Sequence, residues 1–175
     1  MARSPLAAIA AALLSAAAMA WPACAADAGA DRRGPEAFVA WIYDGYGPGQ
    51  HRALDYEGKD AARVFAPSLA ALMRRSLRAH ADEPLDWLSD HDLFCRCQDF
   101  SGLRTTVRLE RSSGDRAWVA ATFSDVGVAQ RPQTLRFELV RRSGAWRIAD
   151  VLDPETGGLR AALLEDVRGP RAHSR

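Results

Sequence analysis

Residues 103–110 read LRTTVRLE, a stretch in which apolar or small side chains alternate with polar and charged ones. A period of two is typical of a β-strand with one buried face and one solvated face. Three further stretches follow the same rule, at residues 117–123, 135–139 and 146–150. Short turns at 113–115 and 142–144, and a longer loop at 127–132, separate these stretches and predict antiparallel neighbours.

A helical period precedes and follows the strands. Pro35 and Glu36 favour a helix start, and Phe38, Ile42 and Tyr46 then recur at steps of four as one apolar stripe. Further helices are expected from Pro67, with Leu69, Leu72, Met73 and Leu77 buried, and at residues 159–167. We therefore predict one α+β domain over residues 35–168. A curved antiparallel sheet of about four strands packs on N-terminal helices and is followed by a short C-terminal helix.

The N-terminus has the pattern of a secretory signal peptide at residues 1–25. Arg3 precedes an uncharged apolar run, which ends in the small residues Ala23-Cys24-Ala25. Cleavage near Ala25 would leave a periplasmic or secreted protein with a flexible leader at 26–34 and a disordered tail at 169–175. A lipid anchor at Cys24 is the alternative. No other segment is long and apolar enough to span a membrane.

Charge and motif content exclude several classes of function. Lys and Arg number 23 and Asp and Glu number 22, so the formal charge is +1 and gives no electrostatic case for a nucleic-acid partner. The chain contains no Gly-x-Ser-x-Gly elbow, no phosphate-binding glycine loop and no His-Glu-x-x-His string. These absences argue against the commonest hydrolases and nucleotide enzymes, and we expect no cofactor.

Cys95 and Cys97 are the only thiols that remain after cleavage of the signal peptide. In an oxidising compartment we favour a local disulfide, which requires a bend at Arg96 because an extended strand holds the two residues too far apart. Three alternatives stay open: two buried thiols, a redox pair, or a metal site completed by His91 and Asp92. A metal site lacks a recognisable second ligand pair, so we expect none.

Asp150 is the foremost candidate for proton transfer. Strand alternation places it on the same side as Trp146 and Ile148, where an apolar environment would raise its pKa. The structural interpretation, which we favour, is that the strand has ended and Asp150 pairs with an arginine or caps a turn. Asp99 and His91 are weaker catalytic candidates: Asp99 suits an Asx turn, and His91 lies in an acidic loop.

Three segments carry a resemblance to a known family. Pro-Glu-Ala-Phe-Val-x-x-Ile-Tyr from residue 35, Cys-Arg-Cys-Gln-Asp at 95–99 and Gly-Ala-Trp-Arg-Ile-Ala-Asp at 144–150 resemble a bacterial family of exported domains of unknown function. That family is similar to the nuclear-transport-factor-two-like, cystatin-like superfamily. The resemblance covers residues 35–165 and implies a cone-shaped sheet with a pocket at its open end. It transfers no catalytic residues.

The function expected from these features is non-catalytic. We predict an exported domain that binds a small apolar ligand or a protein partner, in a pocket lined by Trp41, Tyr43, Tyr46, Trp146 and Asp150. One alternative is a small-molecule isomerase, dehydratase or cyclase in which Asp150 or Asp99 acts as general base and a tyrosine as donor. Another is an envelope interaction module or a toxin-neutralising module.

Overall fold

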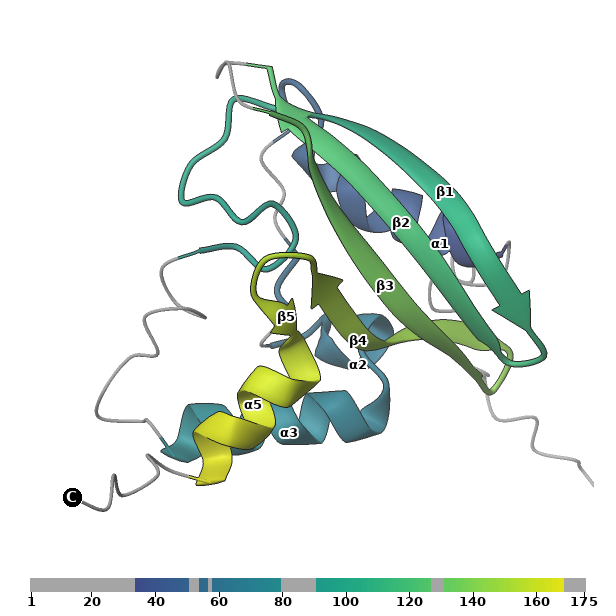
Figure 1. The fold of residues 1–175 in the computed structure, drawn as a ribbon, viewed down its shortest axis with the longest axis vertical. Coiled ribbons are helices and arrows are strands. Elements are labelled where there is room, and N and C mark those ends of the chain that lie inside the picture. Colours follow the sequence, from purple (N-terminus) through teal and green to yellow (C-terminus); the bar gives the residue numbers. More distant parts are fainter. Residues whose placement is uncertain (1–33, 51–53, 57, 80–90, 127–130, 169–175) are drawn as a thin grey trace, which may run out of the picture.

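The computed structural model describes residues 34–50, 54–56, 58–79, 91–126 and 131–168 (Figure 1). The predicted signal peptide, all but the last residue of the predicted leader, and the predicted tail lie outside these ranges. Among the described residues, no helix is both long and apolar enough to cross a membrane.

The chain forms one antiparallel sheet in which every strand lies beside its neighbour in sequence. Its strands are β1 (Leu103–Ser113), β2 (Arg116–Asp125), β3 (Gln133–Arg142), β4 (Ala145–Asp153) and β5 (Gly157–Gly158). The four predicted strands are confirmed. The two-residue β5 was not predicted, since two glycines carry no side-chain pattern; it pairs with the end of β4.

The helices pack against this sheet and against each other. They are α1 (Pro35–Tyr43), continued by the 3₁₀ turn η1 (Asp44–Tyr46), then α2 (Ala61–Val64), α3 (Pro67–Ala79) and α5 (Leu159–Arg168). In Figure 1, α1 lies behind β1 and β2, whereas α3 and α5 lie side by side near β4. The structure therefore confirms the α+β class, with the short C-terminal helix as predicted.

The core is an aromatic layer between α1 and the sheet. Phe38, Ile42 and Tyr46 are fully buried, as their spacing of four predicts. Phe137 of β3 is also fully buried, and its ring lies 6.2 Å from the ring of Tyr43 and 6.2 Å from that of Phe94. Aromatic side chains thus fill the space between α1 and the sheet.

A β-bulge interrupts the pairing of β3 with β4. The register pairs Glu138 with Asp150 but Leu139 with Ile148, so Ala149 is an extra residue on β4. One extra residue reverses the faces to which the following side chains point.

The prediction that Asp150 shares a face with Trp146 and Ile148 is therefore wrong. Ile148 is fully buried, and beyond the bulge it is Val151, at 3% exposure, that takes the next inward position. Asp150 lies opposite Glu138 on the other face and is only half-buried. A period of two predicts the face of a residue only as far as the next bulge.

Replacing Phe137 with alanine tests the aromatic core. We expect the free energy of unfolding to fall by about 3–5 kcal/mol, because the ring has no exposed surface and its removal leaves a cavity. Thr106→Ala, on the exposed face of β1, is the control and should change stability by less than about 0.5 kcal/mol. Equal denaturation midpoints for the two variants would contradict this placement of the core.

Candidate functional site

The loop before β1 contains the favoured disulfide. Cys95 and Cys97 are bonded, and their Cα atoms are 5.2 Å apart, within the usual range for disulfides. Arg96, between them, has φ of +53°, which is the bend that so short a ring requires. The structure therefore contains the bond rather than two thiols. Among the described residues, no group of three or more His, Cys, Asp and Glu side chains is arranged to hold a metal.

Asp92 holds this loop in place. Its Oδ1 accepts hydrogen bonds from the backbone N–H groups of Phe94 (2.8 Å) and Cys95 (3.1 Å), and its Oδ2 accepts one from the hydroxyl of Tyr46 (2.8 Å). Its own backbone N–H donates to the carbonyl of Cys97 (2.9 Å), and its carbonyl accepts from the N–H of Arg96 (2.8 Å). Asp92 therefore fixes both the conformation of the loop and its attachment to η1.

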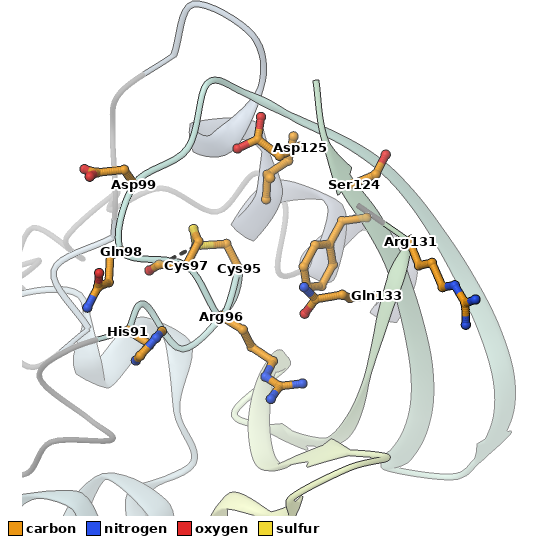
Figure 2. A pocket seen from close by; sticks show the side chains of 12 residues that line it. His91, Cys95, Arg96, Cys97, Gln98, Asp99, Ser124, Asp125, Arg131 and Gln133 are labelled. Atoms are coloured by element: carbon orange, nitrogen blue, oxygen red, sulfur yellow. Dashed lines mark hydrogen bonds between the residues drawn. A yellow bond between two sulfur atoms is a disulfide. The ribbon is translucent and has the colours of Figure 1, made fainter. Parts of the chain in front are cut away.

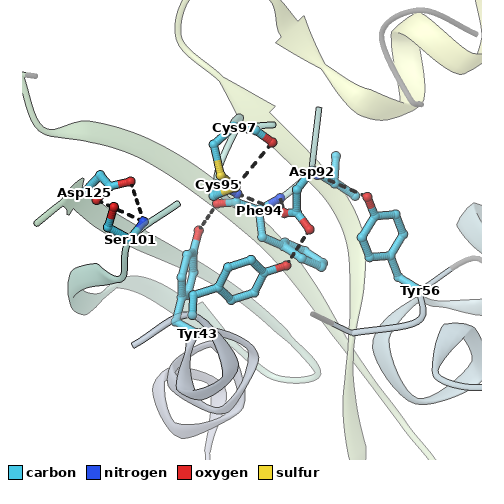
Figure 3. Close-up of a disulfide and its surroundings, with 10 residues drawn as sticks. Tyr43, Tyr56, Asp92, Phe94, Cys95, Cys97, Ser101 and Asp125 are labelled. Carbon is cyan, nitrogen blue, oxygen red and sulfur yellow. Dashed lines mark hydrogen bonds between the residues drawn. A yellow bond between two sulfur atoms is a disulfide. The ribbon is translucent and has the colours of Figure 1, made fainter. Parts of the chain in front are cut away.

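Two more tyrosines bind the same loop, Tyr43 from α1 and Tyr56 from the turn before α2 (Figure 3). The hydroxyl of Tyr43 donates to the carbonyl of Phe94 at 2.9 Å, and the hydroxyl of Tyr56 accepts from the N–H of Leu93 at 3.3 Å. Burial, and secondarily the negative charge of Asp92, raises the pKa of Tyr43 and of Tyr46 above the ordinary value for tyrosine. Both phenols thus stay protonated and serve as hydrogen-bond donors.

A first cavity, which we call the α5 groove, lies between this loop, the β4–β5 turn and α5, and has a volume of about 630 Å³. Its apolar lining residues, which we call the floor, are Leu93, Leu135, Val151, Leu159 and Ala162. Its acidic lining residues, which we call the rim, are Asp92, Asp153, Glu165 and Asp166. The groove thus combines an apolar base with a concentration of negative charge.

A second cavity, which we call the disulfide cavity, has a volume of about 330 Å³. Both cysteines line it, together with His91, Gln98, Asp99, Asp125, Arg131 and Gln133. Figure 2 shows that these side chains come from the 91–99 loop on one side and from the β2 and β3 ends on the other. The side-chain carbonyl oxygen of Gln133 is buried and has no hydrogen-bond partner within the described part of the chain.

Arg96 lines both cavities, as does His91. Its guanidinium lies 2.8 Å from Asp153 and 3.4 Å from Glu155. The Asp153 side chain is only 9% exposed, so this ion pair is largely shielded from water, whereas Glu155 is exposed and contributes little. Through Arg96, the disulfide loop is connected to the turn that precedes α5.

Asp150 has a structural role, as we favoured from the sequence, but the strand does not end before it: β4 continues to Asp153, and Asp150 caps a helix rather than a turn. Its Oδ1 accepts hydrogen bonds from the N–H groups of Val151 and Arg160, both at 2.9 Å, and so caps the first turn of α5. Burial raises the pKa of Asp150 above its ordinary value, and the two hydrogen bonds partly offset this. Asp150 lines neither the α5 groove nor the disulfide cavity.

The structure places the other predicted pocket residues in the core. Tyr43, Tyr46 and Trp146 are buried, and Trp41 is half-buried with the guanidinium of Arg63 over its ring at 4.8 Å. None of them lines either cavity.

The two weaker catalytic candidates, Asp99 and His91, are exposed at the disulfide cavity. They do not come together with Asp150, which lines neither cavity. Sequence reasoning missed the acidic rim formed by Asp153, Glu165 and Asp166. The available signal was their position, with Glu165 and Asp166 adjacent near the end of the last helix and Asp153 shortly before it.

Comparisons with known proteins give little guidance. No family model matches the chain, and no curated protein matches it either. Among solved structures, chains of the type VI effector-immunity complex Tae3-Tai3 from Ralstonia pickettii, in native and selenomethionine form, align at 22% identity with TM-scores of 0.43 and 0.42. The alignments cover 67% of this chain and 89% and 90% of those chains. A likeness this distant carries no argument about function.

Two substitutions test the capping role of Asp150. Asp150→Ala removes the acceptor of two N–H groups and should lower the free energy of unfolding by about 1 kcal/mol. Asp150→Asn keeps a hydrogen-bond acceptor and should lower the free energy of unfolding by less.

The pH dependence of stability separates the carboxylate from the amide. A raised pKa means that the folded state binds the Asp150 proton more tightly, so stability from this group falls as pH rises from the ordinary aspartate pKa through the raised value. Asp150→Asn has no titrating carboxyl group at this position. Its free energy of unfolding relative to wild type should therefore rise with pH across that range. Parallel stability–pH curves for the two proteins would contradict the assignment.

Proposed function

We propose that the chain is an exported, non-catalytic protein-binding module whose α5 groove holds a basic segment of a partner protein. The observation that supports this most is the composition of the groove. Four carboxylates line it beside an apolar floor, together with His91 and with one guanidinium, that of Arg96, which is paired with Asp153. Asp92 and Asp166 accept hydrogen bonds from within the chain, and Glu165 is the exposed carboxylate. Lys and Arg side chains match such a site, since their aliphatic stems pack on apolar surface while their charged ends contact carboxylates.

A small apolar ligand fits this groove less well than a basic segment does. Such a molecule gains nothing from the carboxylates, and it would displace water near them without supplying a charge in return. A protein segment can extend beyond the cavity and use both the floor and the rim. We therefore favour the protein partner over the small ligand of our sequence-based alternatives.

The enzymatic alternative lacks a converging set of groups. Asp150 is occupied as a helix cap, and Asp99 lies at the other cavity. The hydroxyls of Tyr43 and Tyr46 are already donated to Phe94 and Asp92. General acid–base catalysis needs a base and a donor directed at one point, and these residues do not share one.

Export from the cytoplasm remains part of the proposal on the strength of residues 1–25 alone. A toxin-neutralising module is compatible with the groove if the toxin presents a basic segment to it. An envelope protein with such a segment would serve equally well.

A pair of peptides tests the groove. A labelled peptide of alternating Lys and Leu should bind saturably, and one of alternating Glu and Leu should not. Glu165→Lys should weaken binding of the basic peptide by about five- to tenfold, because it reverses one charge of the rim. Asp115→Lys, in the exposed β1–β2 turn away from the groove, makes the same charge change and should leave affinity unaltered at moderate salt.

Two results would contradict the proposal. One is equal binding of the two peptides. The other is equal weakening by Glu165→Lys and Asp115→Lys, which would show a response to net charge alone. Ala162→Trp, which places an indole over the apolar floor, should also reduce binding of the basic peptide.

A further inference from the structure

The disulfide lies where a ligand can reach it. Both sulfur-bearing side chains line the disulfide cavity, but they differ in exposure: Cys97 is half-buried, whereas Cys95 is 3% exposed. In Figure 2 the two cysteines lie at the centre of the cavity-lining residues. Attack on a disulfide requires access to one sulfur, and here Cys97 is the accessible one.

Stability does not account for this bond. A disulfide stabilises a fold mainly by restricting the unfolded chain, and the restriction grows with the length of the closed loop. The Cys95–Cys97 loop closes at a sequence separation of two, near the minimum. It also holds Arg96 at a positive φ, a conformation that non-glycine residues adopt at a cost. Meanwhile Asp92 fixes the same loop through hydrogen bonds that do not need the disulfide.

The cavity has the chemistry to receive a peptide that carries a thiol. Arg131 lines it and favours the thiolate form of a sulfur nearby, whereas the guanidinium of Arg96 is paired with Asp153. Two carboxylates, Asp99 and Asp125, also line it, and in Figure 2 both lie on the opposite side of the cysteines from Arg96. The buried carbonyl oxygen of Gln133 lacks a donor within the described ranges, and a peptide N–H would supply one.

We propose that Cys95–Cys97 is a thiol–disulfide exchange site for a small cysteine-containing peptide bound in the disulfide cavity. The thiolate of the peptide attacks Sγ of Cys97. The Cys95–Cys97 bond breaks, its electron pair stays on Sγ of Cys95, which takes up a proton, and a mixed disulfide joins the peptide to Cys97. A second peptide thiolate then attacks the peptide sulfur of that mixed disulfide and releases Cys97 as a thiol. Two peptide thiols are oxidised to one disulfide, and the protein disulfide is reduced to two thiols.

Reduced glutathione is the probe for the exchange. The folded protein is incubated with it at neutral pH, quenched with an alkylating agent and weighed by mass spectrometry, while tryptophan fluorescence monitors the fold. We expect opening of the disulfide without unfolding. Opening that occurs only at denaturant concentrations that unfold the protein would overturn the proposal.

Two single-cysteine variants test which sulfur reacts. With oxidised glutathione, Cys95→Ser should form a mixed disulfide at Cys97. Cys97→Ser should react at the buried Cys95 at least about tenfold more slowly. Equal rates would overturn the assignment of Cys97 as the accessible sulfur.

A charge reversal tests whether the cavity recognises the probe. Arg131→Glu should slow opening by glutathione, which carries a net negative charge besides that of its thiolate, several-fold more than opening by 2-mercaptoethanol, whose only charge is that of the thiolate. Equal slowing with both thiols, or none with either, would show that the cavity does not bind the peptide. None of these readouts involves the basic peptide. Failure of the proposed exchange site can therefore be distinguished from failure of the proposed α5 groove function.

Discussion

The carboxylate of Asp92 is the interaction on which both cavities depend. It gathers two backbone N–H groups of its own loop and the hydroxyl of Tyr46, which comes from the end of the first helical segment. Because Tyr46 is fully buried in the aromatic core, its hydrogen bond to Asp92 fixes the position of the loop relative to the core. A half-buried carboxylate with three donors is strongly constrained, since loss of any one leaves polar groups without partners.

One side chain of that loop, Arg96, lines the surface on both sides of it. Arg96 extends from the disulfide ring to Asp153 and lines both cavities. The α5 groove owes its negative charge to the 91–99 loop, the end of β4 and the last turns of α5, and the disulfide cavity contains the two sulfurs. Binding at one cavity and exchange at the other are therefore properties of neighbouring sites that share Arg96.

The parts of this structure that depend on local spacing were predictable. The alternation at 103–110 and the steps of four from Phe38 report which face is buried, and the bend at Arg96 follows from the reach of a two-residue span. The face of Asp150 was not predictable, because a single extra residue in β4 reverses the alternation without altering composition. Nor was the role of Asp92, whose partner Tyr46 is 46 residues away in sequence. A contact between residues so far apart in the sequence produces no periodic pattern from which it could be predicted.

Hydrogen exchange at the backbone amides of Phe94 and Cys95 tests the central claim most directly. If Asp92 holds the loop, both amides exchange much more slowly than in an unstructured peptide, and Asp92→Ala removes that protection while Asp99→Ala, in the same loop, leaves it intact. Exchange of both amides at unstructured rates in the wild-type protein would contradict the account, because neither cavity would then have a fixed wall.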